Sequence, residues 1–336
     1  MADSKENEMT VQNRKTTPQT GQISVVTPTY RRPAEILQLL VNLSEQTFLP
    51  YEVILVDGAP PEETETESVV NSVSQSLPFK IRYVRREGGT AVQRNVGVDS
   101  AAGEFIALVD DDVRLDKNFL GKMAEIFRSD DSKKIGALVG YRTNQHFRVE
   151  DSERWRWYKR LNLLTTYEPG RYDFETGYPI NNNLQPPFEG VRPVDFMTTA
   201  CAVWRRDVFD AGLRFHPFFC DYGILEDAHF SLRAGRDWIL LQNGSAHCRE
   251  LGSPNGRVNA RKIGYKCVVN YYFVFQDIIS PLSRAQKFRF WRYQAFEFFR
   301  IASSAVRRRR WCDVQEIVGR VEGAFAVLRG SAGFPD

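Results

Sequence analysis

The sequence predicts an α/β protein with a mostly parallel sheet flanked by helices and a helical C-terminal extension. Short runs of β-branched residues alternate with longer amphipathic runs from Gln22 to about residue 141. Such alternation implies right-handed crossover connections between parallel strands. The last eighty or so residues are instead rich in aromatic residues and arginine, in a mostly helical pattern. With 42% hydrophobic residues, a chain of 336 residues can bury one large core or two modest ones.

The first part of the chain contains four expected strands and the helices that connect them. The strands are 23–27, 51–57, 80–84 and 104–110, and the helices are 34–46, a polar stretch after residue 57, and 90–101. A helix at about 116–129 and a strand at 134–141 follow. Because ligands bind at the carboxyl ends of the strands in such sheets, polar residues at those ends are candidate site residues.

The second part of the chain is less regular. Residues 142–192 have no periodicity, which predicts a long functional loop region rather than a packed element. Residues 194–206 predict a hairpin, a helix is expected to begin close to Glu226, and 237–242 predict a strand. The expected organisation is a flexible tail at 1–21, a sheet domain at 22–258 with halves 22–141 and 142–258, and a helical region at 259–336.

Charge and cysteine content argue against several classes of protein. The 45 basic and 42 acidic residues leave a net charge of +3, too small for the strong field of a general nucleic-acid binder. The five widely spaced cysteines contain no CxxC pair, which fits neither a disulfide framework nor a zinc knuckle. The polar first twenty residues lack the apolar core of a secretory signal, and no window reaches the roughly 20 apolar residues that cross a bilayer. We expect a cytoplasmic protein, either soluble or peripheral on the inner face of the cell membrane.

Three consecutive carboxylates, Asp110, Asp111 and Asp112, follow the apolar run 105–109. Their mutual repulsion is costly unless a cation or hydrogen bonds compensate it. They could cap the helix expected near Asp116, or bind Mn²⁺ or Mg²⁺, which take hard oxygen ligands together with a substrate diphosphate. A calcium loop is disfavoured because the DxDxDG spacing and the distal glutamate are missing. The position at the end of a buried strand favours the metal site.

The segment REGGTAVQRNVG at 86–97 favours a diphosphate ligand. Gly88 and Gly89 permit close backbone approach just before a helix whose N-terminus attracts anions, and Arg94 lies one turn inside that helix. A Gly-Gly pair before a helix is often merely a turn. The signal therefore gains its weight from the neighbouring acidic triplet.

Two further groups have competing interpretations. Glu226-Asp227 lies at an expected helix start, where an acidic pair is usually a cap, but a carboxylate at the end of a half-buried helix can also act as a general base. His247, expected just beyond the strand at 237–242, is a candidate third metal ligand, although a lone histidine is more often structural.

The C-terminal segment 284–311 interleaves aromatic residues with arginine and contains one acidic residue, Glu297. It is either a helix that packs its aromatic residues on the protein and leaves a solvated basic face, or an interfacial helix that contacts anionic lipid. Nucleic-acid binding is disfavoured, because the basic cluster is local and no RNA- or DNA-reading module is visible.

The order of these motifs resembles that of the family-2 glycosyltransferases of the GT-A fold. The resemblance runs from about Ile23 to about residue 275 and rests on seven segments in the same order: TPTYRRP, ILVDG, GGTAVQRNVG, FIALVDDD, VDFMTTACAVWRR, YGILEDAHFSLR and GSAH. It implies an inverting enzyme that moves a sugar from a nucleotide-diphospho-sugar to a hydroxyl of a glycan or lipid-linked acceptor, in polysaccharide or glycolipid assembly, with Mn²⁺ or Mg²⁺. Residues 22–141 would bind the donor and 142–258 the acceptor.

The resemblance also implies roles for individual residues. Asp227 matches the catalytic base, while Asp112 and His247 match metal ligands. Asp57 matches a position that faces the nucleotide base. The positions that match nucleotide-sugar contacts are Thr27, Pro28, Tyr30, Asp57, Gly89, Arg94, Asp110 and Asp111.

The sequence departs from the family pattern at two places. A Gly-Ala pair of many relatives is here Thr199-Ala200, which leaves donor and acceptor undefined, and the common EDxD ending is here Glu226-Asp227-Ala228-His229, which removes one carboxylate. Two other functions compete with the transferase. A sugar-phosphate nucleotidyltransferase would have an N-terminal Gly-rich loop where this chain has TPTYRRP, and the presence of both the acidic triplet and Asp227 argues against an inactive sugar-binding or scaffold protein.

Overall fold

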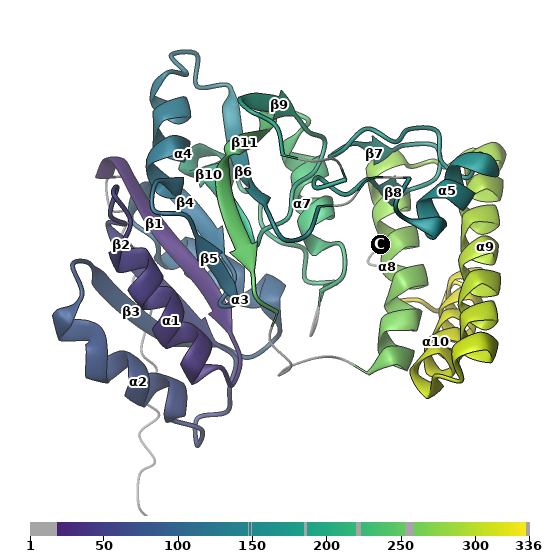
Figure 1. The fold of residues 1–336 in the computed structure, drawn as a ribbon, viewed down its shortest axis with the longest axis horizontal. Coiled ribbons are helices and arrows are strands. Elements are labelled where there is room, and N and C mark those ends of the chain that lie inside the picture. Colours follow the sequence, from purple (N-terminus) through teal and green to yellow (C-terminus); the bar gives the residue numbers. More distant parts are fainter. Residues whose placement is uncertain are drawn as a thin grey trace, which may run out of the picture.

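The computed structural model describes residues 19–146, 148, 150–184, 187–219, 223–252 and 259–333. Within these residues, nine strands form one sheet flanked by helices (Figure 1). The strands of this sheet are β1 (Gln19–Thr29), β2 (Glu52–Asp57), β3 (Lys80–Arg85), β4 (Gly103–Val109), β5 (Val113–Leu115), β6 (Ile135–Arg142), β9 (Val191–Pro193), β10 (Cys201–Arg205) and β11 (Ile239–Glu250).

The strand order is β3-β2-β1-β4-β10-β6-β11-β5, and β9 pairs with β11. Strands β1, β2, β3, β4, β6 and β11 run in one direction, and β5, β9 and β10 run against them. The predicted mostly parallel sheet with flanking helices is therefore confirmed. The parallel register aligns the last residues of three strands, Thr29, Asp57 and Arg85, at one edge.

Helices follow the strands as the periodicity predicts. They are α1 (Pro33–Ser44), α2 (Glu65–Val73), α3 (Thr90–Ser100), α4 (Phe119–Arg128), α5 (Glu153–Arg160), α6 (Arg206–Asp210), α7 (Glu226–Ala234), α8 (Ala260–Ile279), α9 (Arg284–Arg308) and α10 (Trp311–Leu328). Helix α3 packs closely on β1 at Gly97, where an added Cβ would lie 2.2 Å from Val26 Cγ1. This close packing fixes the N-terminus of α3 beside the ends of β1 and β2.

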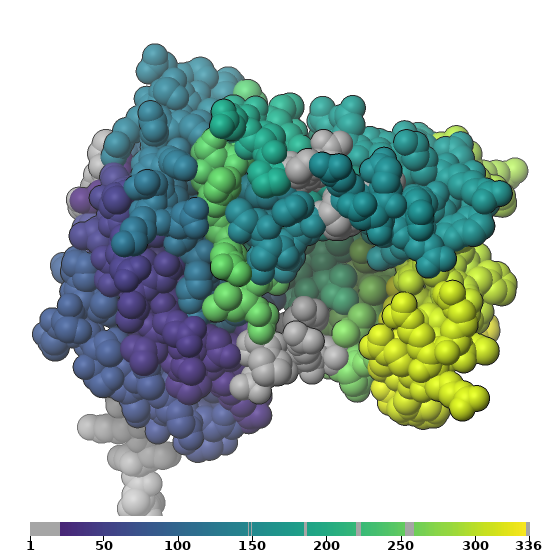
Figure 2. All heavy atoms as spheres, viewed as in Figure 1, coloured from purple at the N-terminus to yellow at the C-terminus, as the bar shows by residue number. Residues whose placement is uncertain are grey.

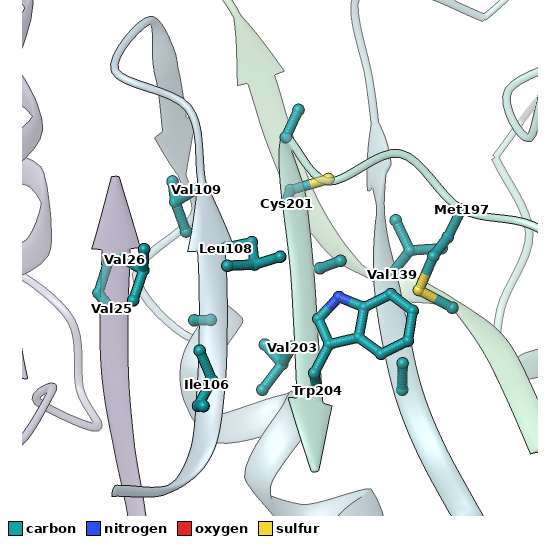
Figure 3. Close-up of a cluster of buried hydrophobic side chains, with 14 of the residues drawn as sticks. Val25, Val26, Ile106, Leu108, Val109, Val139, Met197, Cys201, Val203 and Trp204 are labelled. Atoms are coloured by element: carbon teal, nitrogen blue, oxygen red, sulfur yellow. The ribbon is translucent and has the colours of Figure 1, made fainter. Parts of the chain in front are cut away.

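The hydrophobic core lies along the central strands. Figure 3 shows Val25 and Val26 of β1, Leu108 of β4 and Trp204 of β10 side by side, and each is fully buried. Every residue of β2 is buried as well. Strands that are buried along their whole length are typical of a sheet that is covered on both faces.

The predicted hairpin at 194–206 is wrong. Only Cys201–Arg205 forms a strand, β10, which inserts antiparallel between β4 and β6 with Ala202 opposite both Leu108 and Val139. The apolar sequence of this segment suits a buried strand, but its partners lie far away in the chain. The local pattern therefore could not identify them.

The predicted loop at 142–192 is also wrong in part, because this stretch contains packed structure. Helix α5 and the short strands β7 (Tyr172–Asp173) and β8 (Tyr178–Pro179) lie in it, together with the sheet strand β9. Trp155, Tyr158 and Tyr178 are buried in a cluster with Tyr293 of α9. Aromatic residues without helical periodicity are thus buried by a helix that comes more than a hundred residues later.

The predicted helical C-terminal extension is confirmed by α8, α9 and α10, at the right of Figure 1. Helices α8 and α10 approach each other so closely at Gly319 that a larger residue would not fit. A Cβ added there would lie 1.8 Å from the carbonyl oxygen of Arg261 in α8. Among the described helices, none is long and apolar enough to span a membrane. The proposed tail at 1–21 falls mostly outside the described residues, and β1 already begins at Gln19. The division at 141/142 and 258/259 stays a prediction.

Candidate active site

A cavity of about 610 Å³ lies at the carboxyl edge of the sheet. Its wall contains Pro28, Thr29 and Tyr30 from the end of β1, the whole acidic triplet after β4, and the Gly88-Gly89 pair before α3. Gly58 and Pro60 after β2, Glu250 from the end of β11 and Lys262 from the first turn of α8 also line it. Segments from six parts of the chain therefore form one site, as expected for a sheet with this topology.

The central carboxylate of the triplet is held by protein groups. The Thr29 hydroxyl donates to Asp111 Oδ2 at 2.7 Å, and the Arg32 guanidinium donates to Asp111 Oδ1 at 2.6 Å. Asp111 is only 2% exposed, and burial raises its pKa to about 6 against the opposing effect of Arg32. Arg32 also lies 3.9 Å from Asp112 Oδ2. Part of the charge repulsion within the triplet is therefore compensated by an arginine from the turn after β1.

A second arginine connects the triplet to α7. Arg94 donates one hydrogen bond to Asp110 Oδ1 and one to Glu226 Oε1, each at 2.9 Å. The guanidinium is 3% exposed, and among the described atoms its Nε has no hydrogen-bond partner. Burial raises the pKa of Glu226 to about 7, although Arg94 opposes this and Asp227 adds to it. Arg94 thus positions two carboxylates that are 116 residues apart in the sequence.

Asp227 is the second residue of α7, as predicted from the sequence. Helix α7 begins after Leu225, whose positive φ of 71° turns the chain sharply into the helix. Asp227 Oδ1 accepts a hydrogen bond from the Ala228 amide at 2.7 Å, and burial raises the pKa of this carboxyl. A half-buried carboxylate with raised proton affinity is chemically suited to accept a proton.

The two glycines before α3 adopt conformations that other residues rarely take. Gly88 and Gly89 have φ values of +117° and +85°, and both line the cavity together with Thr90, the first residue of α3. The free amides at a helix N-terminus attract anions. This part of the wall can therefore receive a phosphate group.

Four predicted site residues do not line the cavity: Thr27, Asp57, Asp227 and His247. Asp227 follows Glu226, whose carboxylate accepts a hydrogen bond from the cavity residue Arg94. Thr27 and Asp57 are fully buried, and the Asp57 carboxylate accepts hydrogen bonds from the Ala59 amide at 2.8 Å and the Tyr83 hydroxyl at 2.6 Å. His247 lies inside β11, not beyond a strand as expected, and its Nε2 is 2.9 Å from the Gly244 carbonyl oxygen. The other predicted donor-site residues, Pro28, Tyr30, Gly89, Arg94, Asp110 and Asp111, line the cavity with Asp112.

The carboxylates of the cavity fit a divalent ion that shares its ligands with a substrate. The side chains of Asp110 and Asp112 are 33% and 15% exposed, so both reach the cavity space. In the described part of the chain, no group of three or more His, Cys, Asp and Glu side chains could hold a metal by itself. This donor set matches Mg²⁺ and Mn²⁺ sites, in which one or two carboxylates hold the ion and substrate phosphates complete its coordination.

Several residues of this site were not predicted, among them Thr29, Arg32, Glu250 and Lys262. Arg32 had a local signal, because it directly follows the strand end in TPTYRRP and an arginine beside an acidic strand edge is a natural counter-ion. Glu250 and Lys262 had none, since each reaches the cavity only through the path of β11 and the placement of α8.

Comparison with known proteins shows which family the sequence matches. Residues 24–212, more than half of the chain, match glycosyl transferase family 2. The uncharacterized glycosyltransferase YwdF of Bacillus subtilis is 30% identical over 152 residues, which are 44% of this chain and 55% of that protein. The poly(ribitol-phosphate) beta-N-acetylglucosaminyltransferase TarS of Staphylococcus aureus is 33% identical over 100 residues, 29% of this chain and 17% of TarS. The matched regions thus span about half of YwdF and less of TarS.

The fold is similar to that of solved glycosyltransferases. The mannosyltransferase PcManGT from Pyrobaculum calidifontis, in complex with GDP-Man and Mn²⁺, matches with a TM-score of 0.56 over 93% of this chain and 90% of that chain, at 16% identity. This similarity confirms the GT-A type of fold. The match over residues 24–212, more than half of the chain, shows that the chain belongs to glycosyl transferase family 2.

Proposed function

We propose that this protein transfers a sugar from a nucleotide-diphospho-sugar to an acceptor hydroxyl, with inversion at the anomeric carbon. The observation that carries the proposal is the composition of the cavity wall. Carboxylates suited to a divalent ion lie in the same cavity as a glycine-bounded helix N-terminus suited to a phosphate. A nucleoside diphosphate bound to a divalent ion requires both.

The donor would extend along the carboxyl edge of the sheet. Tyr30, which is 40% exposed, offers an aromatic face at one part of the wall, and the amides after Gly89 offer hydrogen-bond donors for the diphosphate. Lys262 adds a positive charge from the helical region. Arg94 and Arg32 are bound to Asp110 and Asp111, so they act mainly by holding these carboxylates in position.

Asp112 and Asp110 would hold Mn²⁺ or Mg²⁺ together with the donor diphosphate. When bound, the ion supplies Lewis-acid stabilisation of the negative charge that develops on the departing diphosphate. His247 as an additional ligand stays a prediction, because the described conformation directs its ring toward Gly244 and Asp116.

Asp227 would act as the base. Its carboxylate accepts the proton of the acceptor hydroxyl while the acceptor oxygen forms a bond to the anomeric carbon and the bond from that carbon to the diphosphate breaks. Attack from the face opposite the leaving group inverts the configuration. The raised pKa of Asp227 supports this role, because a base that is too acidic would not take the proton.

The acceptor is proposed to be a growing glycan or a lipid-linked sugar. The name of the related TarS states a transfer to a ribitol-phosphate polymer, which is the observation that favours polysaccharide or glycolipid assembly. Figure 2 shows this face of the molecule hollowed between β11 and the C-terminal helices, which offers space for an extended acceptor.

Calorimetric titration with a panel of UDP-, GDP- and dTDP-sugars, with and without Mn²⁺, tests the proposal. We expect one donor class to bind in a metal-dependent manner, and we expect Asp112→Ala to lose this binding. The matched control is Asp131→Ala, which removes an exposed carboxylate away from the cavity. Absence of binding to any donor would overturn the proposal, and binding without turnover on any acceptor would instead indicate a sugar-binding protein.

A further inference from the structure

The turn between α9 and α10 carries exposed groups that the proposed chemistry does not use. Four consecutive arginines, Arg307 to Arg310, are all exposed. They lie between two large apolar side chains, Val306 and Trp311, which are 79% and 71% exposed. Arg309, with a φ of 50°, ends α9, and α10 begins at Trp311. The result is a compact tip, residues 306–311, in which apolar and cationic side chains are adjacent.

The rest of the segment 284–311 is divided between two roles. Phe290, Tyr293 and Ile301 are buried, so part of its aromatic content packs on the protein, as one interpretation predicted. Phe288 and Phe299 are 67% and 68% exposed on the same helix. Phe288 and Phe299 are eleven residues apart in α9. Because eleven residues make almost three whole helical turns, the two side chains lie on nearly the same side of the helix. The solvent side of α9 is therefore partly apolar.

The positive charge of the tip is not cancelled by the acidic residue of this segment. Glu297 is fully buried and is paired with Arg154 and Arg300. The described acidic group next to the tip is Asp313, which lies 3.9 Å from the Nε of Arg310. A single carboxylate beside four guanidinium groups leaves a strongly positive surface.

The tip lies at the same end of the molecule as the active site. In Figure 1 the carboxyl end of β1 and the turn between α9 and α10 both lie toward the lower part of the view. Helix α8 connects the two regions, because Lys262 in its first turn lines the cavity while its residue Arg261 contacts Gly319 of α10. A surface that bound the tip would therefore lie on the side of the molecule where the cavity is.

We propose that the tip docks the protein on an anionic lipid surface, with Trp311 and Val306 in the interfacial region and Arg307 to Arg310 on the lipid phosphates. Tryptophan is favoured at the boundary between headgroups and acyl chains, and arginine pairs well with phosphate. Cytoplasmic leaflets carry the required negative charge. This inference is independent of the identity of the donor, since donor binding occurs within the sheet edge.

Flotation of the full chain with vesicles tests the inference. We expect retention on mixed phosphatidylglycerol and phosphatidylcholine vesicles, and little on pure phosphatidylcholine. Each arginine near such a surface contributes about fivefold to partitioning, so changing Arg307, Arg308, Arg309 and Arg310 to Gln should weaken retention roughly several hundredfold. Trp311→Ser should weaken it severalfold without a change in charge.

Two matched controls test whether flotation depends on the tip itself or on positive charge and apolar surface anywhere on the protein. The variant Lys80→Gln, Lys117→Gln, Lys133→Gln and Lys134→Gln removes four exposed positive charges elsewhere, and Val41→Ser removes an exposed apolar side chain of α1. Both should float like the wild type, and all variants should keep their donor affinity in calorimetry. Absence of flotation, or an equal loss in the lysine control, would overturn the inference. A change of oligomeric state for Trp311→Ser in analytical ultracentrifugation, with flotation unchanged, would show a contact between copies instead.

Discussion

Glu226 and Glu297 are both buried glutamates with arginine partners, yet their pKa values shift in opposite directions. Glu226, in the active site, shares Arg94 with Asp110 and has Asp227 beside it, so burial prevails and its pKa rises to about 7. Burial also acts on Glu297 in the helical region. There, Arg300, Arg154 and the Tyr158 hydroxyl outweigh burial, and the pKa is held below its usual range.

The number of hydrogen-bonding and cationic partners of each carboxylate explains this difference. It also distinguishes a carboxylate that can take part in chemistry from one that stabilises the fold. Arg300 contacts both oxygens of Glu297 at 2.9 Å, and Arg154 contacts Oε2 at 3.0 Å. A carboxylate with such partners is fixed in its charged form and connects α5 to α9. At the sheet edge, Arg32 is shared by Asp111 and Asp112, and Arg94 by Asp110 and Glu226, so each arginine faces two carboxylates. Carboxylates arranged in this way can bind a metal ion or a proton. The helical region is thus expected to respond to mutation through stability, and the sheet edge through chemistry.

The largest effect is expected for Asp227→Asn, which removes the proposed base while keeping the shape of the side chain. Loss of a general base typically lowers the turnover rate by roughly 10²- to 10⁴-fold. We expect this loss in kcat, measured as nucleoside diphosphate release, with the donor Kd nearly unchanged. Asp237→Asn, an exposed change just after α7, is the control. Normal turnover of Asp227→Asn would remove Asp227 from the mechanism.

The second prediction concerns Glu297→Ala. The change removes the buried carboxylate that Arg154 and Arg300 share, and because both arginine side chains are about a third exposed, water can partly replace it. Loss of charged hydrogen bonds of this kind costs about 1–3 kcal/mol of the free energy of unfolding. Urea denaturation measures this cost. Glu322→Ala removes a carboxylate from an exposed ion pair with Arg261, which solvent screens, and should change the free energy of unfolding far less. Equal costs for the two variants would contradict the structural role of Glu297.

A third prediction uses pH to distinguish the two glutamates. Because the folded state raises the pKa of Glu226 from 4.5 to about 7, the native protein holds this proton more tightly than the unfolded chain does. The resulting stabilisation is complete below about pH 4.5 and disappears as the pH rises through 7. Glu226→Gln should therefore flatten the decline of the free energy of unfolding over this range. Some decline should remain, because the raised pKa of Asp111 acts in the same direction.

Glu297 should give the opposite dependence. Its lowered pKa stabilises the native state above the usual glutamate pKa, and this contribution is lost as the pH falls through the folded-state pKa. Chemical denaturation of Glu297→Gln across acidic pH should show a weaker acid dependence than the wild type. If the two glutamine variants changed the pH profile in the same direction, the comparison between the two sites would fail.

The smallest effect is expected for Lys262→Ala. Lys262 is exposed at the cavity wall, so its attraction to a diphosphate is screened by solvent, and we expect the donor Kd to rise about threefold to fivefold. The loss should shrink as the salt concentration increases. Lys134→Ala, far from the cavity wall, should leave the Kd unchanged. An unchanged Kd for Lys262→Ala would show that Lys262 does not contribute to donor binding and that the donor contacts lie within the sheet domain.

The sequence by itself determined the class of fold and much of the chemistry. The alternation of strands and helices, the carboxylates at the end of β4, the glycines before α3 and the acidic start of α7 are local signals, because each depends on periodicity or on residues a few positions apart. Local signals of this kind, together with the family resemblance, led to the prediction of part of the cavity wall, including the acidic triplet, Gly89 and Arg94.

Only the tertiary structure decided how these carboxylates are compensated and what else joins them. The pairing of Arg94 with Glu226 spans 132 residues, and Lys262 enters the cavity from a helix that follows the whole sheet. The place of β10 between β4 and β6, and the burial of Glu297 against α5, are equally distant relations. Such contacts depend on the packing of the complete core, which no short stretch of sequence encodes. For this reason, these long-range contacts could not be predicted from the sequence.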